Sequence, residues 1–140
     1  MMKKKASALL ASLIVLMLAL IAAGCGSKPS LDEWYSDNKS MFDEEVASVD
    51  PDISGYTYEI MVIDSNVLMY KRTLLMSYPT DADNLAVLTD VYDAQFDTYK
   101  IRYSQLLEQM NAETSTKNIV IRLAAFNPDG TELYSRDYTE

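Results

Sequence analysis

The stretch "YTYEIMVIDSNVLMYKRTLLMS", residues 56–77, decides the fold class of this chain. Side chains over 56–63 alternate with a period of two, which is the period of a β-strand. Apolar and β-branched residues resume at Val67, so a second strand is expected from Val67 to Ser77. The intervening Asp64-Ser65-Asn66 is typical of a turn in which Asn66 takes a positive φ. The stretch therefore predicts a β-hairpin in which Ile63 pairs with Val67.

A helix is expected on each side of this hairpin. The segment Ser30–Glu33 matches a capping box, in which the serine hydroxyl and the glutamate carboxylate each accept from the other residue's backbone N–H. Apolar residues then recur every three or four positions, which predicts a helix over 31–48. After the hairpin, Thr80 or Asp81 can cap a second and longer helix that continues to Met110.

The chain closes with a second expected hairpin. Its strands are predicted over 118–126 and 132–138, and the turn Asn127-Pro128-Asp129-Gly130 places glycine where a positive φ is needed. The order helix, hairpin, helix, hairpin predicts an α+β domain. We expect a single antiparallel four-stranded sheet with two helices packed on one face.

The N-terminus has the layout of a secretory signal. Three lysines at positions 3–5 precede an uncharged apolar run, which ends in the small residues that a signal peptidase accepts. A short membrane-spanning helix is the alternative interpretation of this run. We expect 1–24 to be a signal peptide that is cleaved after Gly24. The remainder is then a lipidated Cys25 with a short tether over 25–29, followed by an exported domain over 30–140.

The lipid acceptor is inferred from a resemblance. Ala22-Ala23-Gly24-Cys25 resembles the lipobox of bacterial lipoproteins, in which the cysteine thiol receives diacylglycerol and becomes the mature N-terminus. Together with "SLDEWYSDNKSMFDEEV", residues 30–46, and the two hairpins, it resembles small Gram-positive lipoproteins catalogued as a domain of unknown function. The resemblance implies a lipid-anchored protein on the extracytoplasmic face of the cell membrane. It supplies no catalytic residues.

The charge of the chain excludes one class of partner. It carries 21 acidic and 12 basic residues, no histidine and a net charge of −9. Cleavage before Cys25 removes three of the 12 basic residues and no acidic ones, which takes the net charge from −9 to −12. Such a surface is repelled by phosphate backbones, so we expect no nucleic-acid partner. It is also repelled by anionic lipid, so membrane attachment requires the anchor on Cys25.

The sequence offers few groups for catalysis. With no histidine, the commonest general base and metal ligand is absent. Lys71, beside Arg72, is the best placed candidate for a catalytic lysine, and a solvated strand position is the preferred interpretation. Asp90, Asp93 and Asp97 share one helix face, but a straight helix supplies fewer oxygen ligands than a calcium ion needs. We expect no enzyme, no cofactor and no metal site.

Two hypotheses for a functional surface remain. Met61, Ile63, Val67 and Met69 share one face of the first hairpin, and the opposite face is apolar as well. Either the fold covers this second face internally, or an envelope or secreted protein contacts it, which makes the domain a protein-interaction module. The alternative hypothesis is a small-ligand pocket between the second helix and the sheet, lined by Tyr92, Phe96, Tyr99 and Tyr103. Aromatic residues at this spacing are also typical of a core.

Overall fold

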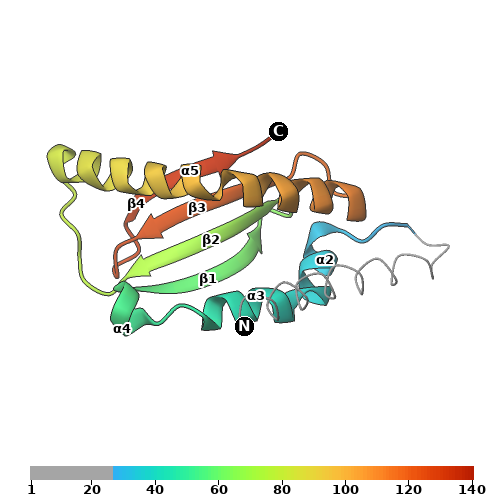
Figure 1. Cartoon of the computed structure of the whole chain (residues 1–140), viewed down its shortest axis with the longest axis horizontal. Helices are drawn as coiled ribbons and strands as arrows, with labels where there is room; N and C mark the ends of the chain where they lie inside the picture. Colours follow the sequence, from blue (N-terminus) through green and yellow to red (C-terminus); the bar gives the residue numbers. More distant parts are fainter. Residues whose placement is uncertain (1–26) are drawn as a thin grey trace, which may run out of the picture.

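The structure is a computed structural model that describes residues 27–140 as one sheet with helices along one of its faces (Figure 1). The expected signal peptide, its cleavage site at Gly24 and the lipidated Cys25 lie outside the described residues. In chain order the elements are α2 (Leu31–Asp37), α3 (Lys39–Ala47), α4 (Pro51–Ser54), β1 (Tyr56–Ile63), β2 (Val67–Leu74), α5 (Ala82–Glu113), β3 (Val120–Phe126) and β4 (Glu132–Tyr138).

The sheet is mixed, and its strands follow the order β1-β2-β3-β4. The two hairpins pair antiparallel as expected, but β2 and β3 run parallel, with Val67 opposite Val120. The expectation of a wholly antiparallel sheet is therefore wrong for the central pair. The reason is α5, whose 32 residues span about 48 Å at 1.5 Å per residue. It returns the chain to the end of the sheet at which β2 began, and such a crossover makes the next strand parallel.

The first hairpin keeps its predicted register with a different turn. Ile63 pairs with Val67, but the positive φ values belong to Asp64 (50°) and Ser65 (64°) rather than to Asn66. The side chain of Asn66 instead donates to the Asn118 carbonyl at 2.8 Å, which ties the turn to the segment before β3. Strand β2 ends at Leu74, earlier than the predicted Ser77.

The expected first helix is broken in two at Asn38. This residue has φ −101° and ψ 11°, and the Trp34 carbonyl accepts from both its side-chain amide at 2.8 Å and its backbone N–H at 3.0 Å. The capping box at Ser30 and Glu33 is present as predicted. The longer helix is capped by Asp81, one of the two predicted caps, and continues past the predicted Met110 to Glu113.

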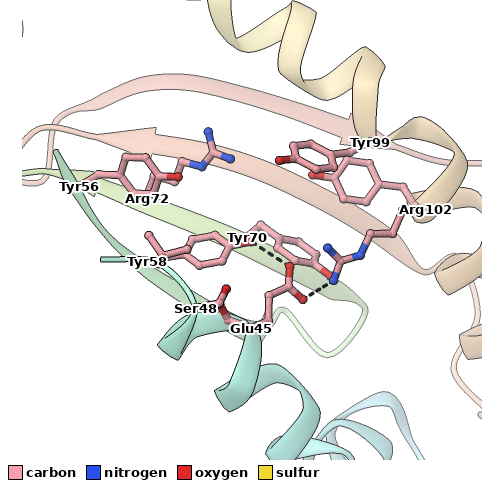
Figure 2. Close-up of a pocket in the computed structure, with 10 residues that line it drawn as sticks. Glu45, Ser48, Tyr56, Tyr58, Tyr70, Arg72, Tyr99 and Arg102 are labelled. Carbon is pink, nitrogen blue, oxygen red and sulfur yellow. Dashed lines mark hydrogen bonds and ion pairs between the residues drawn. The ribbon is translucent and has the colours of Figure 1, made fainter. Parts of the chain in front are cut away.

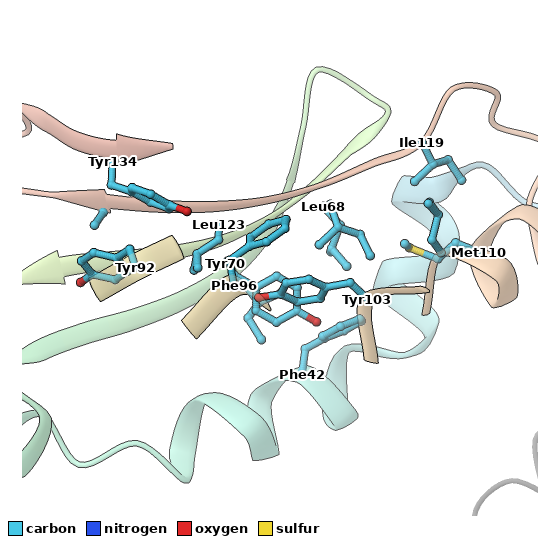
Figure 3. Packing of buried hydrophobic residues seen from close by; sticks show 14 of the residues in the cluster. Phe42, Leu68, Tyr70, Tyr92, Phe96, Tyr103, Met110, Ile119, Leu123 and Tyr134 are labelled. Atoms are coloured by element: carbon cyan, nitrogen blue, oxygen red, sulfur yellow. The ribbon is translucent and has the colours of Figure 1, made fainter. Parts of the chain in front are cut away.

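The helices form one layer and cover different strands. Helix α5 packs against β3 and β4, whereas α2, α3 and α4 pack against β1. Between the helix layer and the sheet lies a continuous core of aromatic and aliphatic side chains (Figure 3). Its fully enclosed members include Leu31, Phe42, Leu68, Tyr70, Phe96, Leu107, Met110, Ile121 and Leu123. Because α3 and α5 rest on opposite halves of the sheet, the strands between them form the floor of a cleft.

Candidate functional site

A cleft of about 180 Å³ lies between α3 and α5, above β1 and β2 (Figure 2). Each of these four elements contributes side chains to it, and most of these are aromatic or charged. The lining residues are Glu45, Ser48, Val49, Tyr56, Tyr58, Tyr70, Arg72, Tyr99, Arg102 and Tyr103.

Arg72 is the most unusual of these residues, because it is a charged side chain on the core-facing side of β2. It is only 7% exposed. One guanidinium nitrogen, Nη1, donates to the side-chain oxygen of Gln95, and the guanidinium carbon lies 4.9 Å from the Tyr56 ring centroid. Its Nε has no hydrogen-bond partner. No ion pair in the described part of the chain includes Arg72, so its charge is buried without a counterion.

Tyr70, two positions earlier on the same face of β2, is also buried and also has a polar atom without a hydrogen-bond partner. Its side chain is 2% exposed, and its hydroxyl has no hydrogen-bond partner. Among the described residues, Tyr70 Oη and Arg72 Nε are the buried side-chain polar atoms without a partner. A buried polar atom without a partner costs about 1–3 kcal/mol, and native structures retain few of them. The side chains of both residues line the same cleft, which makes this cleft the candidate site.

An ion pair closes one side of the cleft. Arg102, on α5, donates to the Glu45 carboxylate on α3, and the Tyr58 hydroxyl donates to the same carboxylate at 3.5 Å (Figure 2). The Glu45 carboxylate therefore accepts from both Arg102 and Tyr58, whereas no carboxylate of the described residues forms an ion pair with Arg72. The lining thus carries two guanidinium groups against one carboxylate, an excess of positive charge in a chain of net charge −9.

Burial keeps three tyrosines of the cleft, Tyr58, Tyr70 and Tyr103, protonated. Burial, followed by the nearby Glu45 carboxylate, raises the pKa of Tyr58 and Tyr70 well above the ordinary value. Burial also raises the pKa of Tyr103 to about 12. At neutral pH these hydroxyls are hydrogen-bond donors, and a ligand that carries acceptor oxygens can use them.

The structure divides the predicted ligand pocket. Tyr99 and Tyr103 line the cleft, whereas Tyr92 and Phe96 are buried in the core. The Tyr92 ring stacks on Tyr134 with centroids 5.1 Å apart. Sequence reasoning missed the strand contribution, which includes Tyr56, Tyr58, Tyr70 and Arg72. The signal for it is the period of two, which places Arg72 on the same strand face as Tyr70.

The predicted interaction residues share the sheet face opposite the cleft and contact each other. Ile63 lies opposite Val67, and Met61 lies opposite Met69. Val67 and Met69 are only 6% and 8% exposed, while Met61 and Ile63 are half-buried. These four residues therefore offer a partner little apolar surface.

The acidic face of α5 and a second hollow are weaker candidates for a binding site. Asp93 and Asp97 lie 3.1 and 3.6 Å from the Arg136 guanidinium, so two of the three aspartates on the α5 face are engaged in ion pairs. Within residues 27–140, no cluster of three or more ligating side chains could hold a metal ion. The second hollow, of about 450 Å³, lies beside the end of α5. Its lining includes Leu107 on this helix and Glu140 at the end of the chain. None of the unpartnered buried atoms of the described residues lines it.

Comparison with known proteins places the chain in a family. The family described as Domain of unknown function (DUF4854) matches residues 31–138, from the first residue of α2 to the last residue of β4. The chain belongs to this family. No curated protein and no solved structure matches it. Across residues 27–140, none of the helices combines the length and the apolar character needed to cross a bilayer.

Proposed function

We propose that this DUF4854 protein is a lipid-anchored, extracytoplasmic protein that binds a small molecule in the cleft between α3 and α5. One observation carries the binding role: the unpaired Tyr70 hydroxyl and the unpaired Arg72 Nε belong to side chains that line the same cleft. A ligand with acceptor oxygens would satisfy both atoms and neutralise the charge of Arg72.

The anchor rests on the sequence before the domain. An uncharged run that ends at Gly24-Cys25 supports export and lipidation of Cys25, with the Gram-positive cell surface as the location. Few residues separate Cys25 from α2, whose first residue is Leu31. At no more than about 3.6 Å per residue, this tether keeps the cleft within a short distance of the membrane.

The chemistry of the lining supports binding rather than catalysis. The arginines are hydrogen-bond donors without an acceptor atom, and Tyr58, Tyr70 and Tyr103 have raised pKa values and stay protonated. The one carboxylate of the lining, Glu45, is engaged by Arg102. The lining therefore has donors that orient a ligand, but no group free to accept and return a proton near pH 7.

A second candidate function is docking onto an envelope or secreted protein, as the sequence first suggested. The observation that favours it lies at the α4 end of the domain, where Ile53 and Met76 are 85% and 82% exposed. The backbone N–H of Leu75 donates to the Gly55 carbonyl, so the segments that carry these side chains are adjacent. This end lies across the sheet from the segment that precedes α2 (Figure 1). It would face away from a membrane that holds Cys25.

The anchor is tested by Cys25→Ser, with the distribution of the full chain between membrane and soluble fractions as the readout. We expect the variant to leave the membrane fraction. Retention in the membrane would instead support the uncleaved spanning helix.

The binding role is tested by native mass spectrometry of the full chain, purified from membranes in mild detergent. We expect a small-molecule adduct on the wild-type chain that Arg72→Gln loses. The matched control is Arg122→Gln, because Arg122 lies on the opposite face of the same sheet, paired with Asp137 at 2.7 Å. This control should keep the adduct. Absence of an adduct from the wild-type chain, or its equal retention by both variants, would overturn the role of the cleft.

A further inference from the structure

The charge of the ligand follows from the pairing of the arginines. Arg102, Arg122 and Arg136 each form an ion pair with a carboxylate of the domain. Arg72 is the remaining arginine of the chain, and its residue is also more buried than these three. A buried charge without a counterion is costly, whereas burial together with an opposite charge compensates much of that cost. An anion from outside the chain would compensate the buried charge of Arg72.

The kind of anionic group is indicated by the unpartnered Nε of the guanidinium. Nη1 of Arg72 is already engaged by Gln95, and the Tyr56 and Tyr92 rings lie over the guanidinium with centroids at 4.9 and 5.4 Å. The Nε of Arg72 has no hydrogen-bond partner. Arg122 shows how a guanidinium of this domain binds a carboxylate, because its Nε donates to Asp137 at 2.7 Å and its Nη2 donates to the same group at 2.9 Å. A carboxylate oxygen can accept from the Nε of Arg72 in the same way.

The rest of the ligand is indicated by the walls of the cleft. Tyr99 and Tyr103 line it from α5, and Tyr56 and Tyr58 line it from β1. Aromatic walls of this kind favour a planar or apolar group, which packs against the rings. The cleft volume of about 180 Å³ is small, so the enclosed part of the ligand is compact.

Resting on the proposed function, we infer that the ligand is a compact aromatic carboxylate. Its carboxylate pairs with Arg72 and accepts a hydrogen bond from the Tyr70 hydroxyl, and its ring packs among the tyrosines of the cleft. This pairing would satisfy both unpartnered buried atoms and supply the counterion that Arg72 lacks.

Calorimetric titration of the full chain with simple probes tests the inference. Phenylacetate combines ring and charge, acetate has the charge alone, and 2-phenylethanol has the ring alone. We expect phenylacetate to bind at least about tenfold more tightly than either, since a hydrogen bond to a charged group contributes about 1.5–3 kcal/mol, a tenfold or larger factor. Equal affinity for phenylacetate and 2-phenylethanol would overturn the role of the charge. Inorganic phosphate that binds as tightly as phenylacetate would overturn the choice of a carboxylate.

Two variants locate the binding. Arg72→Gln should lower the affinity for phenylacetate by about tenfold or more, because it removes the charged guanidinium group. Tyr70→Phe removes a single oxygen atom that has no partner in the unliganded chain, so it should fold normally and lower the affinity by a few-fold. Arg122→Gln is the control that leaves the affinity unchanged. Undiminished affinity in both Arg72→Gln and Tyr70→Phe would overturn the site.

The outcome for the ligand class can be separated from the outcome for the cleft. If the wild-type chain carries an adduct that Arg72→Gln loses, but the adduct is uncharged and phenylacetate does not bind, the carboxylate inference fails and the binding role stands. If neither an adduct nor any probe binds, both fail together.

Discussion

The indole N–H of Trp34 donates a hydrogen bond of 2.6 Å to the Glu113 carboxylate, which joins the first helix of the domain to the last residue of α5. Two further bonds lie beside it. The backbone N–H of Leu31 donates to Thr116 Oγ1 at 2.9 Å, and the backbone N–H of Ser115 donates to the Pro29 carbonyl at 2.8 Å. The point at which the chain enters the domain is thereby fastened to the end of its longest helix.

Trp34→Phe should weaken this attachment. Phenylalanine keeps an aromatic ring against Phe42, but it cannot donate to Glu113. We expect a loss of about 1.5–3 kcal/mol in the free energy of unfolding, the range for a hydrogen bond to a charged group. Urea denaturation followed by circular dichroism measures this loss, because the variant lacks the tryptophan fluorophore. Glu113→Gln keeps an acceptor and should lose less. A stability of Trp34→Phe equal to wild type would mean that the bond contributes nothing.

Tyr70→Phe and Tyr134→Phe should change the stability in opposite directions. Both remove one hydroxyl from a buried ring, but the Tyr70 hydroxyl has no partner, whereas the Tyr134 hydroxyl donates to the Asp93 carboxylate at 2.7 Å. Without ligand, we expect Tyr70→Phe to gain about 1 kcal/mol and Tyr134→Phe to lose about 1.5–3 kcal/mol. Urea denaturation of the two variants side by side provides the measurement. A clear loss from Tyr70→Phe would indicate that its hydroxyl already has a partner in solution.

The fold should lose stability in alkali. Tyr103 has its pKa raised to about 12 by burial, above the ordinary value of 10.0, and burial raises the pKa of Tyr58 and Tyr70 as well. Above pH 10 the unfolded chain releases these protons and the folded chain retains them. Stability is therefore complete below pH 10 and falls toward pH 12, by about 1.4 kcal/mol per pH unit for each such tyrosine.

The urea midpoint as a function of pH measures this dependence, and the ultraviolet absorbance of tyrosinate reports the ionisation in parallel. Tyr103→Phe is the control and should make the decline shallower. A midpoint that stays constant between pH 10 and 12 would contradict the assignment.

Asp93→Asn should loosen the edge strand β4. Asp93 accepts from the Tyr134 hydroxyl and from Arg136, so it links α5 to β4 through two side chains. We expect a loss of about 1–3 kcal/mol and faster amide hydrogen exchange along β4. Asp90→Asn is the matched control, since Asp90 is exposed on the same helix, and should stay within about 0.5 kcal/mol of wild type. Equal exchange in the two variants would argue against the link.

Features set by neighbouring residues were predictable from the sequence. The caps at Ser30 and Asp81 depend on a side chain and a backbone N–H three residues away. The register of the first hairpin follows from a short turn and an alternating pattern. The break at Asn38 is not predictable in this way, because the apolar spacing continues across it and gives no sign of the non-helical backbone of Asn38.

Features that join distant segments were not predictable in the same way. The parallel pairing of β2 with β3 depends on how α5 carries the chain across the sheet, which residue spacing does not encode. The cleft also joins segments that lie far apart in the sequence. The helix pattern alone identifies Tyr99 and Tyr103, but the place of Arg72 in the cleft depends on α3, α5 and two strands that surround it. In the sequence, Arg72 follows Lys71 and resembles an ordinary solvated strand residue.

The bond between Ser115 and Pro29 also determines how the domain would respond to force. If the chain is held at Cys25, tension along the tether reaches Pro29 first and passes through Ser115 and Trp34 into the end of α5. The segment 27–30 and this end of α5 lie on the same side of the domain (Figure 1). A pull would therefore load α2 first, which is held to α5 and also to β1, where the Tyr35 hydroxyl donates to the Ile60 carbonyl.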